Sequence, residues 1–177
     1  MWASSLLEAF RRRRAPPEAR LAEIGLAKGM KVADIGAGYG YFALPAAEMV
    51  GEGGTVYAVE PNPKRADEIS RRAGASGIKN LEVIVVGAED LAGIPSGEVD
   101  AAISISSFHH FADPQEALLE LRRIVKRGGL VYVKDMKAGR FFKHGSRAEE
   151  FRKLISRQFP GAVFEEGSGY LVARVRL

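Results

Sequence analysis

The sequence predicts an α/β fold in which a doubly wound, mostly parallel sheet carries helices on both faces. Short apolar segments rich in β-branched residues alternate with longer amphipathic segments, and Gly or Pro marks most of the changes. The chain ends in two strand-like segments around Gly167-Ser168-Gly169, a pattern typical of an antiparallel hairpin. Five alternating strands and this hairpin predict a seven-stranded sheet.

We expect two helices before the sheet begins. Residues 1–14 place Leu and Phe side chains on one face and end in the run Arg11–Arg14. Two interpretations of this run stay open: a phosphate-binding patch, or a solvated helix end whose cations are favoured near the helix C-terminus. Pro16-Pro17 interrupts the chain, and a second helix is predicted over Glu18–Ile24.

The next segment is the one on which the functional argument depends. The apolar run Val32–Ile35 predicts a buried strand, and it ends in glycines at alternate positions, Gly36, Gly38 and Gly40. A helix is predicted over 42–50. A strand, a glycine turn and a helix in this order allow backbone N–H groups to approach a ligand closely.

An acidic residue, Glu60, ends the next predicted strand, Thr55–Val59. It lies 20 positions after Gly40, about the spacing at which a carboxylate binds the hydroxyls of a ribose. Together with the glycine turn it predicts a site for a nucleoside-type cofactor. An ordinary strand-to-helix turn that contains glycines is the alternative.

The spacing of the glycines discriminates between nucleoside cofactors. A dinucleotide site has the pattern Gly-x-Gly-x-x-Gly, and here Tyr41 stands where the last glycine would be. No Gly-Lys-Ser/Thr follows, so a phosphate-cradling loop is not indicated. Asp34 lies at the strand end just before the glycines, where it would repel a phosphate and attract a cation. The pattern therefore favours a cationic nucleoside.

The remaining elements follow from apolar periodicity and from turn residues. Pro63 and Pro114 each follow a polar capping residue, which predicts a helix start. Gly128-Gly129 is expected to end the helix that begins at Pro114. In order, we expect a helix over 63–73, strands Leu81–Val86 and Val99–Ile105, a helix from Pro114 to the stop at Gly128-Gly129 with Leu118, Leu119, Leu121, Ile124 and Val125 inward, a strand Leu130–Asp135, a helix Arg147–Phe159, and hairpin strands Ala162–Glu165 and Tyr170–Arg176.

Length and composition limit the classes of protein to consider. The 177 residues predict a single domain, with N-terminal helices over 1–28, a cofactor-binding core over 31–135, and a C-terminal helix and hairpin over 136–177. Cysteine is absent, which excludes disulfides, thiolate ligands and a cysteine nucleophile. With three histidines and no His-x₃-His spacing, no metal centre is expected. The net charge of +4 permits nucleic-acid binding without requiring it.

The pattern Asp34-x-Gly36-x-Gly38-x-Gly40 with Glu60 resembles the first two motifs of the class I S-adenosylmethionine-dependent methyltransferases. The resemblance covers nearly the whole chain and implies a Rossmann-like methyltransferase fold with S-adenosylmethionine as cofactor. It implies that the cofactor contacts Asp34, Gly36, Ala37, Gly38, Tyr39, Gly40, Glu60 and Pro61.

The resemblance also implies an adenine-binding segment after the third strand. The usual sequence there is Gly-Asp-Ala-Glu-Asp-Leu-Pro, whereas this chain has Gly87-Ala88-Glu89-Asp90-Leu91, so that Gly87 replaces the first Asp. Glu89 or the backbone of Ala88 would then contact the adenine, with a solvated turn as the alternative. The end of the fourth strand, including Ser104, is expected beside the transferred methyl group.

The segment after the fourth strand is the candidate acceptor site. The sequence Ser-x-Phe-His-His-Phe-x-Asp-Pro, residues 106–114, is similar to the corresponding segment of small-molecule methyltransferases related to quinone biosynthesis. An imidazole of His109 or His110 would orient or deprotonate an acceptor, and packing of the doublet is the alternative. His144 is expected at the surface. We expect the N-terminal helices and the 136–147 loop to form a lid over the site.

The resemblance implies a methyltransferase that transfers the sulfonium methyl to an O, N or C nucleophile of a small molecule. The alternative is a methyltransferase-fold protein that binds the cofactor, RNA or a partner protein without turnover. An Asp/Asn-Pro-Pro-Tyr/Phe signature for nucleic-acid amino groups and cysteines for cytosine C5 or arsenite are absent. No apolar run would span a bilayer. We expect a cytoplasmic protein, and the shortage of Asn, Gln and Cys predicts a heat-adapted source.

Overall fold

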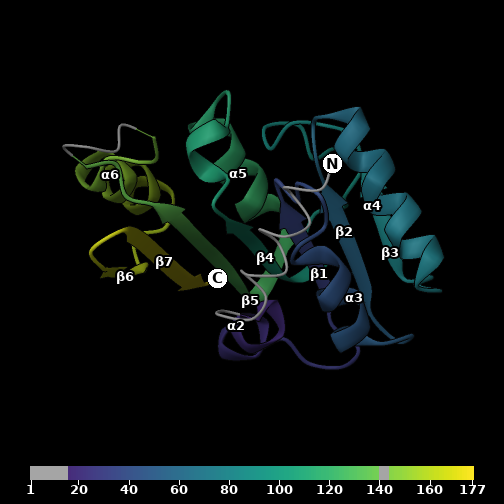
Figure 1. Ribbon diagram of the computed structural model, residues 1–177. Helices are drawn as coiled ribbons and strands as arrows, with labels where there is room; N and C mark the ends of the chain where they lie inside the picture. The colour runs from purple at the N-terminus through teal and green to yellow at the C-terminus, as the bar shows by residue number, and fades with distance from the viewer. Residues whose placement is uncertain (1–15, 140–143) are drawn as a thin grey trace.

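The computed structural model describes residues 16–139 and 144–177 and has the predicted α/β architecture (Figure 1). Seven strands form one sheet in the order β3-β2-β1-β4-β5-β7-β6. The elements in chain order are α2 Pro17–Ile24, β1 Lys31–Ile35, α3 Ala43–Val50, β2 Thr55–Val59, α4 Pro63–Ala75, β3 Leu81–Ile84, β4 Val99–Ile105, the 3₁₀ turn η1 Phe108–His110, α5 Pro114–Ile124, β5 Val125–Met136, α6 Ala148–Gln158, β6 Val163–Glu166 and β7 Tyr170–Arg176.

The direction of the strands confirms the doubly wound sheet with its hairpin. Strands β1 to β5 pair in parallel, with β1 between β2 and β4. Strand β7 inserts antiparallel beside β5, and β6 pairs with it at the sheet edge. The order of the strands reverses between β1 and β4. The connections that follow these two strands therefore run in opposite directions, and a crevice that can hold a ligand is left at the carboxyl ends of the strands.

Alternate side chains of each strand point to opposite faces of the sheet. Helices cover both faces, so both sets of side chains are buried. Ala33 and Ile35 of β1 contribute to an apolar cluster with residues of α5 and α6. Val32 contributes to a second cluster with residues of α2, α3 and α4. Figure 1 shows α5 and α6 on one side of the sheet and α2 and α3 on the other.

Two helix starts follow the predicted capping chemistry. The side chain of Asn62 accepts from the N–H groups of Lys64 and Arg65, and Pro63 occupies the first turn of α4. Asp113 caps α5 in the same way, ahead of Pro114. An oxygen at this position satisfies N–H groups that have no partner inside the helix.

The prediction for the end of α5 is wrong. The helix ends at Ile124, and Val125 already begins β5, where it pairs with Val99 of β4. Over such a short apolar run, a buried strand and a buried helix face have the same composition, so the sequence does not distinguish them. Leu119, expected inward, is 43% exposed.

Other predicted boundaries need smaller corrections or are not described. Strand β3 ends at Ile84 rather than at Val86, and α4 continues to Ala75. The expected helix over 1–14 with the run Arg11–Arg14 lies outside the described residues, as do residues 140–143 of the expected lid. Among the described helices none is long and apolar enough to cross a membrane.

Leu118→Ala and Leu119→Ala on α5 form a matched pair that tests the core. Leu118 is fully buried and its neighbour is 43% exposed. We expect Leu118→Ala to lower the free energy of unfolding by about 2–5 kcal/mol, because it removes buried apolar surface and leaves a cavity. Leu119→Ala should change it by about 0.5 kcal/mol or less. Urea unfolding measures both, and equal losses would contradict the orientation of α5.

Candidate functional site

A cavity of about 640 Å³ opens at the carboxyl ends of β1, β2 and β4. This volume is in the range of small-molecule and cofactor sites. The residues that the sequence analysis assigned to the site and that line the cavity are Asp34, Gly36, Ala37, Gly38, Tyr39, Glu60, Pro61, Ala88, Glu89 and His110.

The glycine turn is held against β2 by backbone hydrogen bonds. The N–H groups of Gly36 and Ala37 both donate to the carbonyl of Val59, at 2.8 and 2.9 Å. Gly36 has φ +78°, and a Cβ there would collide with the side chain of Ser107. Glycine is therefore required at this position for its conformation and for its lack of a side chain.

The carboxylate of Glu60 fixes the rest of the turn. It is 3% exposed, and its Oε2 accepts from the N–H of Gly38 at 2.9 Å. Its Oε1 accepts from the N–H of Asn62 at 3.1 Å, and Arg65 lies 3.7 Å from the same oxygen. Glu60 therefore joins the turn to the start of α4 and leaves acceptor capacity at the cavity wall.

Asp34 carries an unused acceptor at the base of the cavity. It is 2% exposed, and its Oδ2 has no hydrogen-bond partner among the described residues. Burial raises the pKa of Asp34 to about 7; the N–H of Ala43 opposes this shift, and the charge of Glu60 adds to it. An unpaired buried carboxyl group is costly, and a cationic or donor-rich ligand would remove the cost.

At Gly87, where the chain departs from the family sequence, the side chain of Glu89 lies close by. A Cβ at Gly87 would lie 2.5 Å from Oε1 of Glu89, so the carboxylate of Glu89 occupies the space beside residue 87. Both residues, with Ala88, line the cavity. The acidic group expected at position 87 is thus replaced in space by the one at position 89.

The end of β4 differs from the prediction for Ser104. Ser104 is fully buried, does not line the cavity, and shares a 2.8 Å hydrogen bond with Ser107. Ser107 in turn donates to the carbonyl of Ile35. Ser106 and Ser107 line the cavity instead. Ser106 has φ 60°, a strained conformation for a residue with a side chain.

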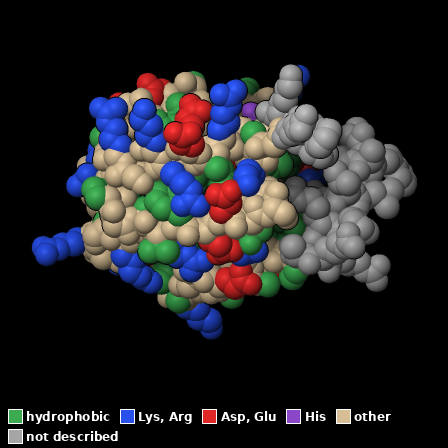
Figure 2. Space-filling view, turned by 90° about the vertical axis from the view of Figure 1, so that its left-hand side faces the viewer, with side chains coloured by type: hydrophobic (Ala, Val, Ile, Leu, Met, Phe, Trp, Pro, Cys, Tyr) green, Lys and Arg blue, Asp and Glu red, His purple; other side chains and the backbone are tan. Residues whose placement is uncertain are grey.

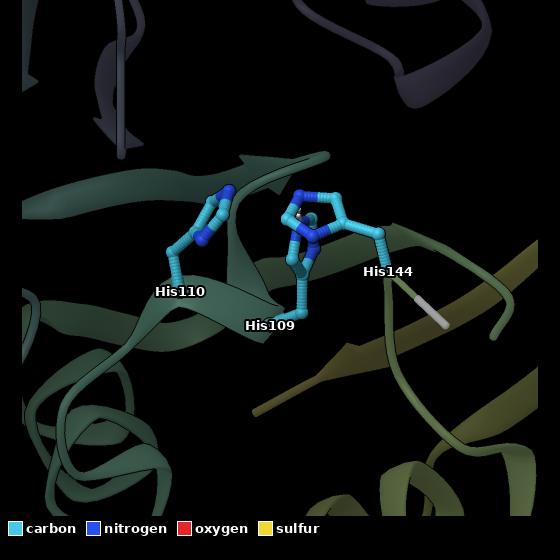
Figure 3. A group of neighbouring side chains, drawn as sticks. All are labelled: His109, His110 and His144. Carbon is cyan, nitrogen blue, oxygen red and sulfur yellow. Dashed lines mark hydrogen bonds between the residues drawn. The ribbon is translucent and has the colours of Figure 1, made fainter. Parts of the chain in front are cut away.

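The three histidines of the chain lie together beside this cavity (Figure 3). Nδ1 of His109 lies 2.7 Å from Oδ1 of Asp135, and its Nε2 lies 3.2 Å from Nε2 of His144. The ring centroids of His109 and His110 are 4.0 Å apart. Burial, followed by the neighbouring His109 and His144, lowers the pKa of His110.

Ten of the residues assigned to the site thus line this cavity, and three do not. Gly40, Ser104 and His109 do not line the main cavity, and His109 lines a neighbouring one of about 200 Å³. Arg65 also lines the cavity and is not among the residues predicted from the sequence. The predicted cap and Pro at the start of α4 place Arg65 in the first turn, which was the available signal.

Comparisons with known proteins identify a family and several relatives of this chain. A family model described as methyltransferase domain matches residues 33–133. A ubiquinone biosynthesis O-methyltransferase of Rhizobium leguminosarum bv. trifolii is 34% identical over 121 residues, 68% of this chain and 44% of that protein. Aklanonic acid methyltransferase DauC of Streptomyces sp. (strain C5) is 32% identical over 103 residues, 58% of this chain and 46% of that protein.

A solved structure extends the likeness over nearly the whole chain. The SAM-dependent methyltransferase from Aquifex aeolicus has a TM-score of 0.77 and 26% identity, covering 93% of this chain and 90% of that one. The fold and site thus define a class I methyltransferase domain. The chain belongs to the methyltransferase domain family. It spans less than half the length of the curated relatives it matches.

The cofactor of this family is S-adenosylmethionine, and the cavity fits it. The cofactor carries a sulfonium, an ammonium and two ribose hydroxyls. The orphaned oxygen of Asp34 offers a partner for a cation or donor, and Glu60 has acceptor capacity for hydroxyls. Among the described residues no lysine lines the cavity to bind a pyrophosphate, and Arg65 lies beside Glu60.

Asp34→Asn tests the buried carboxyl through the pH dependence of stability without ligand. Because the folded protein holds this proton up to about pH 7 and the unfolded chain releases it near the ordinary pKa of 3.8, the free energy of unfolding falls as pH rises through this interval. From pH 5 to pH 8 the wild type should lose about 2–3 kcal/mol more than Asp34→Asn. Urea unfolding at both pH values measures this, and parallel losses would contradict the raised pKa.

Proposed function

We propose that the protein is an S-adenosylmethionine-dependent methyltransferase that transfers the sulfonium methyl to an O, N or C nucleophile of a small-molecule acceptor. The observation that supports it most is the pairing of two buried carboxylates, Asp34 and Glu60, around the glycine turn. They match the cation and the hydroxyls of the cofactor. A turn that only joined a strand to a helix would not need an unpaired carboxyl group in its wall.

When bound, the cofactor supplies a methyl group activated by positive sulfur. The protein's own groups bind, orient and exclude water, because alignment of nucleophile and methyl contributes most to such a displacement. Asp34 and Glu60 would hold the cofactor from the β1 and β2 sides, and Ala88 and Glu89 would hold its base. Ser106, Ser107 and Phe111 line the β4 side, where an acceptor would enter.

An acceptor with an O–H or N–H group must lose a proton during the reaction. His110 lines the cavity and offers an imidazole for this purpose. His109 does not line it and is held by Asp135, so we assign it to positioning rather than to contact with the acceptor. Of the two histidines expected at the acceptor, we therefore propose that His110 is the one that contacts it.

The relatives support a small molecule as acceptor. One of them is named for aklanonic acid, and another is an O-methyltransferase of ubiquinone biosynthesis.

The surface supports the same proposal. Figure 2 shows Lys and Arg side chains interspersed with Asp and Glu on the viewed face. At the β6 edge, for example, Lys137 and Arg152 both pair with Glu166.

The second candidate, a methyltransferase-fold protein that binds cofactor, RNA or a protein partner without turnover, depends on the run Arg11–Arg14, which lies outside the described residues. Incubation with methyl-labelled S-adenosylmethionine and a panel of phenols, enols, carboxylic acids and amines separates the two. Label transferred to one chemical class supports the enzyme. Cofactor binding with no transfer, together with salt-sensitive RNA binding lost in Arg11–Arg14→Ala, would support the binding protein.

Glu60→Ala should weaken the binding of S-adenosylhomocysteine by about 1.5–3 kcal/mol, because a buried acceptor of hydroxyl groups is lost. Glu48→Ala is the matched control, since Glu48 is exposed on the neighbouring helix α3 and does not line the cavity. Titration calorimetry measures both. Equal affinities of Glu60→Ala and Glu48→Ala would remove Glu60 from the cofactor site.

A further inference from the structure

The histidine cluster has the features of a metal site. Nitrogen ligand atoms of His109, His110 and His144 all lie within 4.8 Å of one another. They come from two segments, the 3₁₀ turn after β4 and the loop after β5 (Figure 3). The chain has no other histidine and no cysteine, so every soft nitrogen ligand it possesses is in this one place.

We propose that His109, His110 and His144 bind one divalent transition-metal ion of the zinc type at the edge of the cofactor cavity. The expectation of no metal centre relied on short spacings along the chain, and His144 follows His109 by 35 positions. Only the fold brings them together.

The distance between two of the nitrogens suits a shared ion. Nε2 of His109 and Nε2 of His144 are 3.2 Å apart. A tetrahedral zinc with bonds of about 2.0–2.1 Å keeps its ligand nitrogens about 3.3–3.4 Å apart. The third ring, His110, is exposed, so its side chain can rotate to complete the set.

The second shell is already in place. Nδ1 of His109 faces Oδ1 of Asp135 at 2.7 Å, and the hydroxyl of Ser146 donates to Oδ2 of the same carboxylate at 2.5 Å. With its Nδ1 proton donated to Asp135, His109 presents the lone pair of Nε2 to the cluster. A carboxylate behind a metal-binding histidine fixes the tautomer and strengthens the ligand. Asp135 also supplies a negative charge near the cation, and both side chains are almost fully buried, at 5% and 0% exposure.

The positions of the imidazole protons are consistent with metal binding. Nε2 of His109 and Nε2 of His144 lie at hydrogen-bond distance. In the tautomer in which Nδ1 of neutral His109 donates to Asp135, the proton between the two Nε2 atoms belongs to His144. Metal binding moves that proton of His144 to its other nitrogen and requires no charged imidazole. Three nitrogen ligands leave at least one position for water or an oxygen of a ligand.

The position beside the cavity gives this site a consequence that rests on the proposed function. His110 lines the cofactor cavity and belongs to the cluster. An ion held there would use the lone pair of His110 that otherwise accepts a proton, so His110 would act as a ligand and not as a base. The ion would bind an anionic oxygen of the acceptor, such as a phenolate or enolate, and so favour oxygen acids over amines.

Cobalt(II) titration of the tag-free, chelator-treated protein tests the site without using the cofactor. We expect one ion per chain, intense visible d–d absorption typical of tetrahedral coordination, a dissociation constant in the micromolar range or below, and displacement by zinc. His144→Ala should weaken binding at least tenfold. Asp135→Asn should weaken it by about 10–100-fold at unchanged stoichiometry. Glu149→Ala, an exposed change on the first turn of α6, is the control.

Two outcomes would overturn the proposal: weak octahedral absorption only, or equal affinities in wild type and His144→Ala. Each variant is first checked for a thermal unfolding transition like that of the wild type without any ligand, which confirms that it is folded. Failure of the proposed function would appear separately, as metal binding without any binding of S-adenosylhomocysteine.

Discussion

The hydrogen bond from the N–H of Gly38 to the carboxylate of Glu60 links the two strands on which the site depends. It spans 22 positions of the chain and bridges the turn after β1 to the end of β2. The parallel pairing of these strands brings the two ends together, and the backbone bonds from Gly36 and Ala37 to Val59 hold the turn in place. A loop pinned in this way needs little reorganisation on binding, so less of the binding energy is lost to ordering.

Asp34, in contrast to the hydrogen-bonded turn, lowers the stability of the protein without a ligand. A buried carboxyl group with one oxygen unpaired and a pKa raised to about 7 destabilises the unliganded fold at neutral pH. The core on either side of the sheet offsets this cost through the apolar clusters packed on its two faces. A site can thus keep a buried unpaired oxygen where a ligand will satisfy it, while stability comes from buried residues such as Leu121 and Phe151 that do not line the cavity.

The sequence predicted the features that local chemistry determines. The ends of β1, β2 and β4, the glycine turn, and the caps at Asn62 and Asp113 depend on neighbouring residues, and the structure has them in the expected places. The boundary at Val125 was missed because strand pairing with Val99, a residue far away in sequence, overrides a helical pattern.

The histidine cluster and the inward turn of Ser104 could not be predicted for a related reason. Three histidines separated by up to 35 positions meet only once β5 lies beside β4 and the loop after β5 returns over the 3₁₀ turn. Ser104 is on the strand and points inward, whereas Ser106 and Ser107 follow it and reach the cavity. A sequence shows which residues end a strand and leaves open which of them faces a ligand.

The most direct test of the account is titration calorimetry of the wild-type protein with S-adenosylmethionine, S-adenosylhomocysteine and, as control, NAD. The account predicts micromolar binding of both sulfur nucleosides with one site per chain and no binding of NAD, because two carboxylates and a short glycine turn favour a cation and disfavour a pyrophosphate. Binding of NAD alone, or of none of the three, would contradict the assignment of Asp34 and Glu60 to a sulfonium nucleoside.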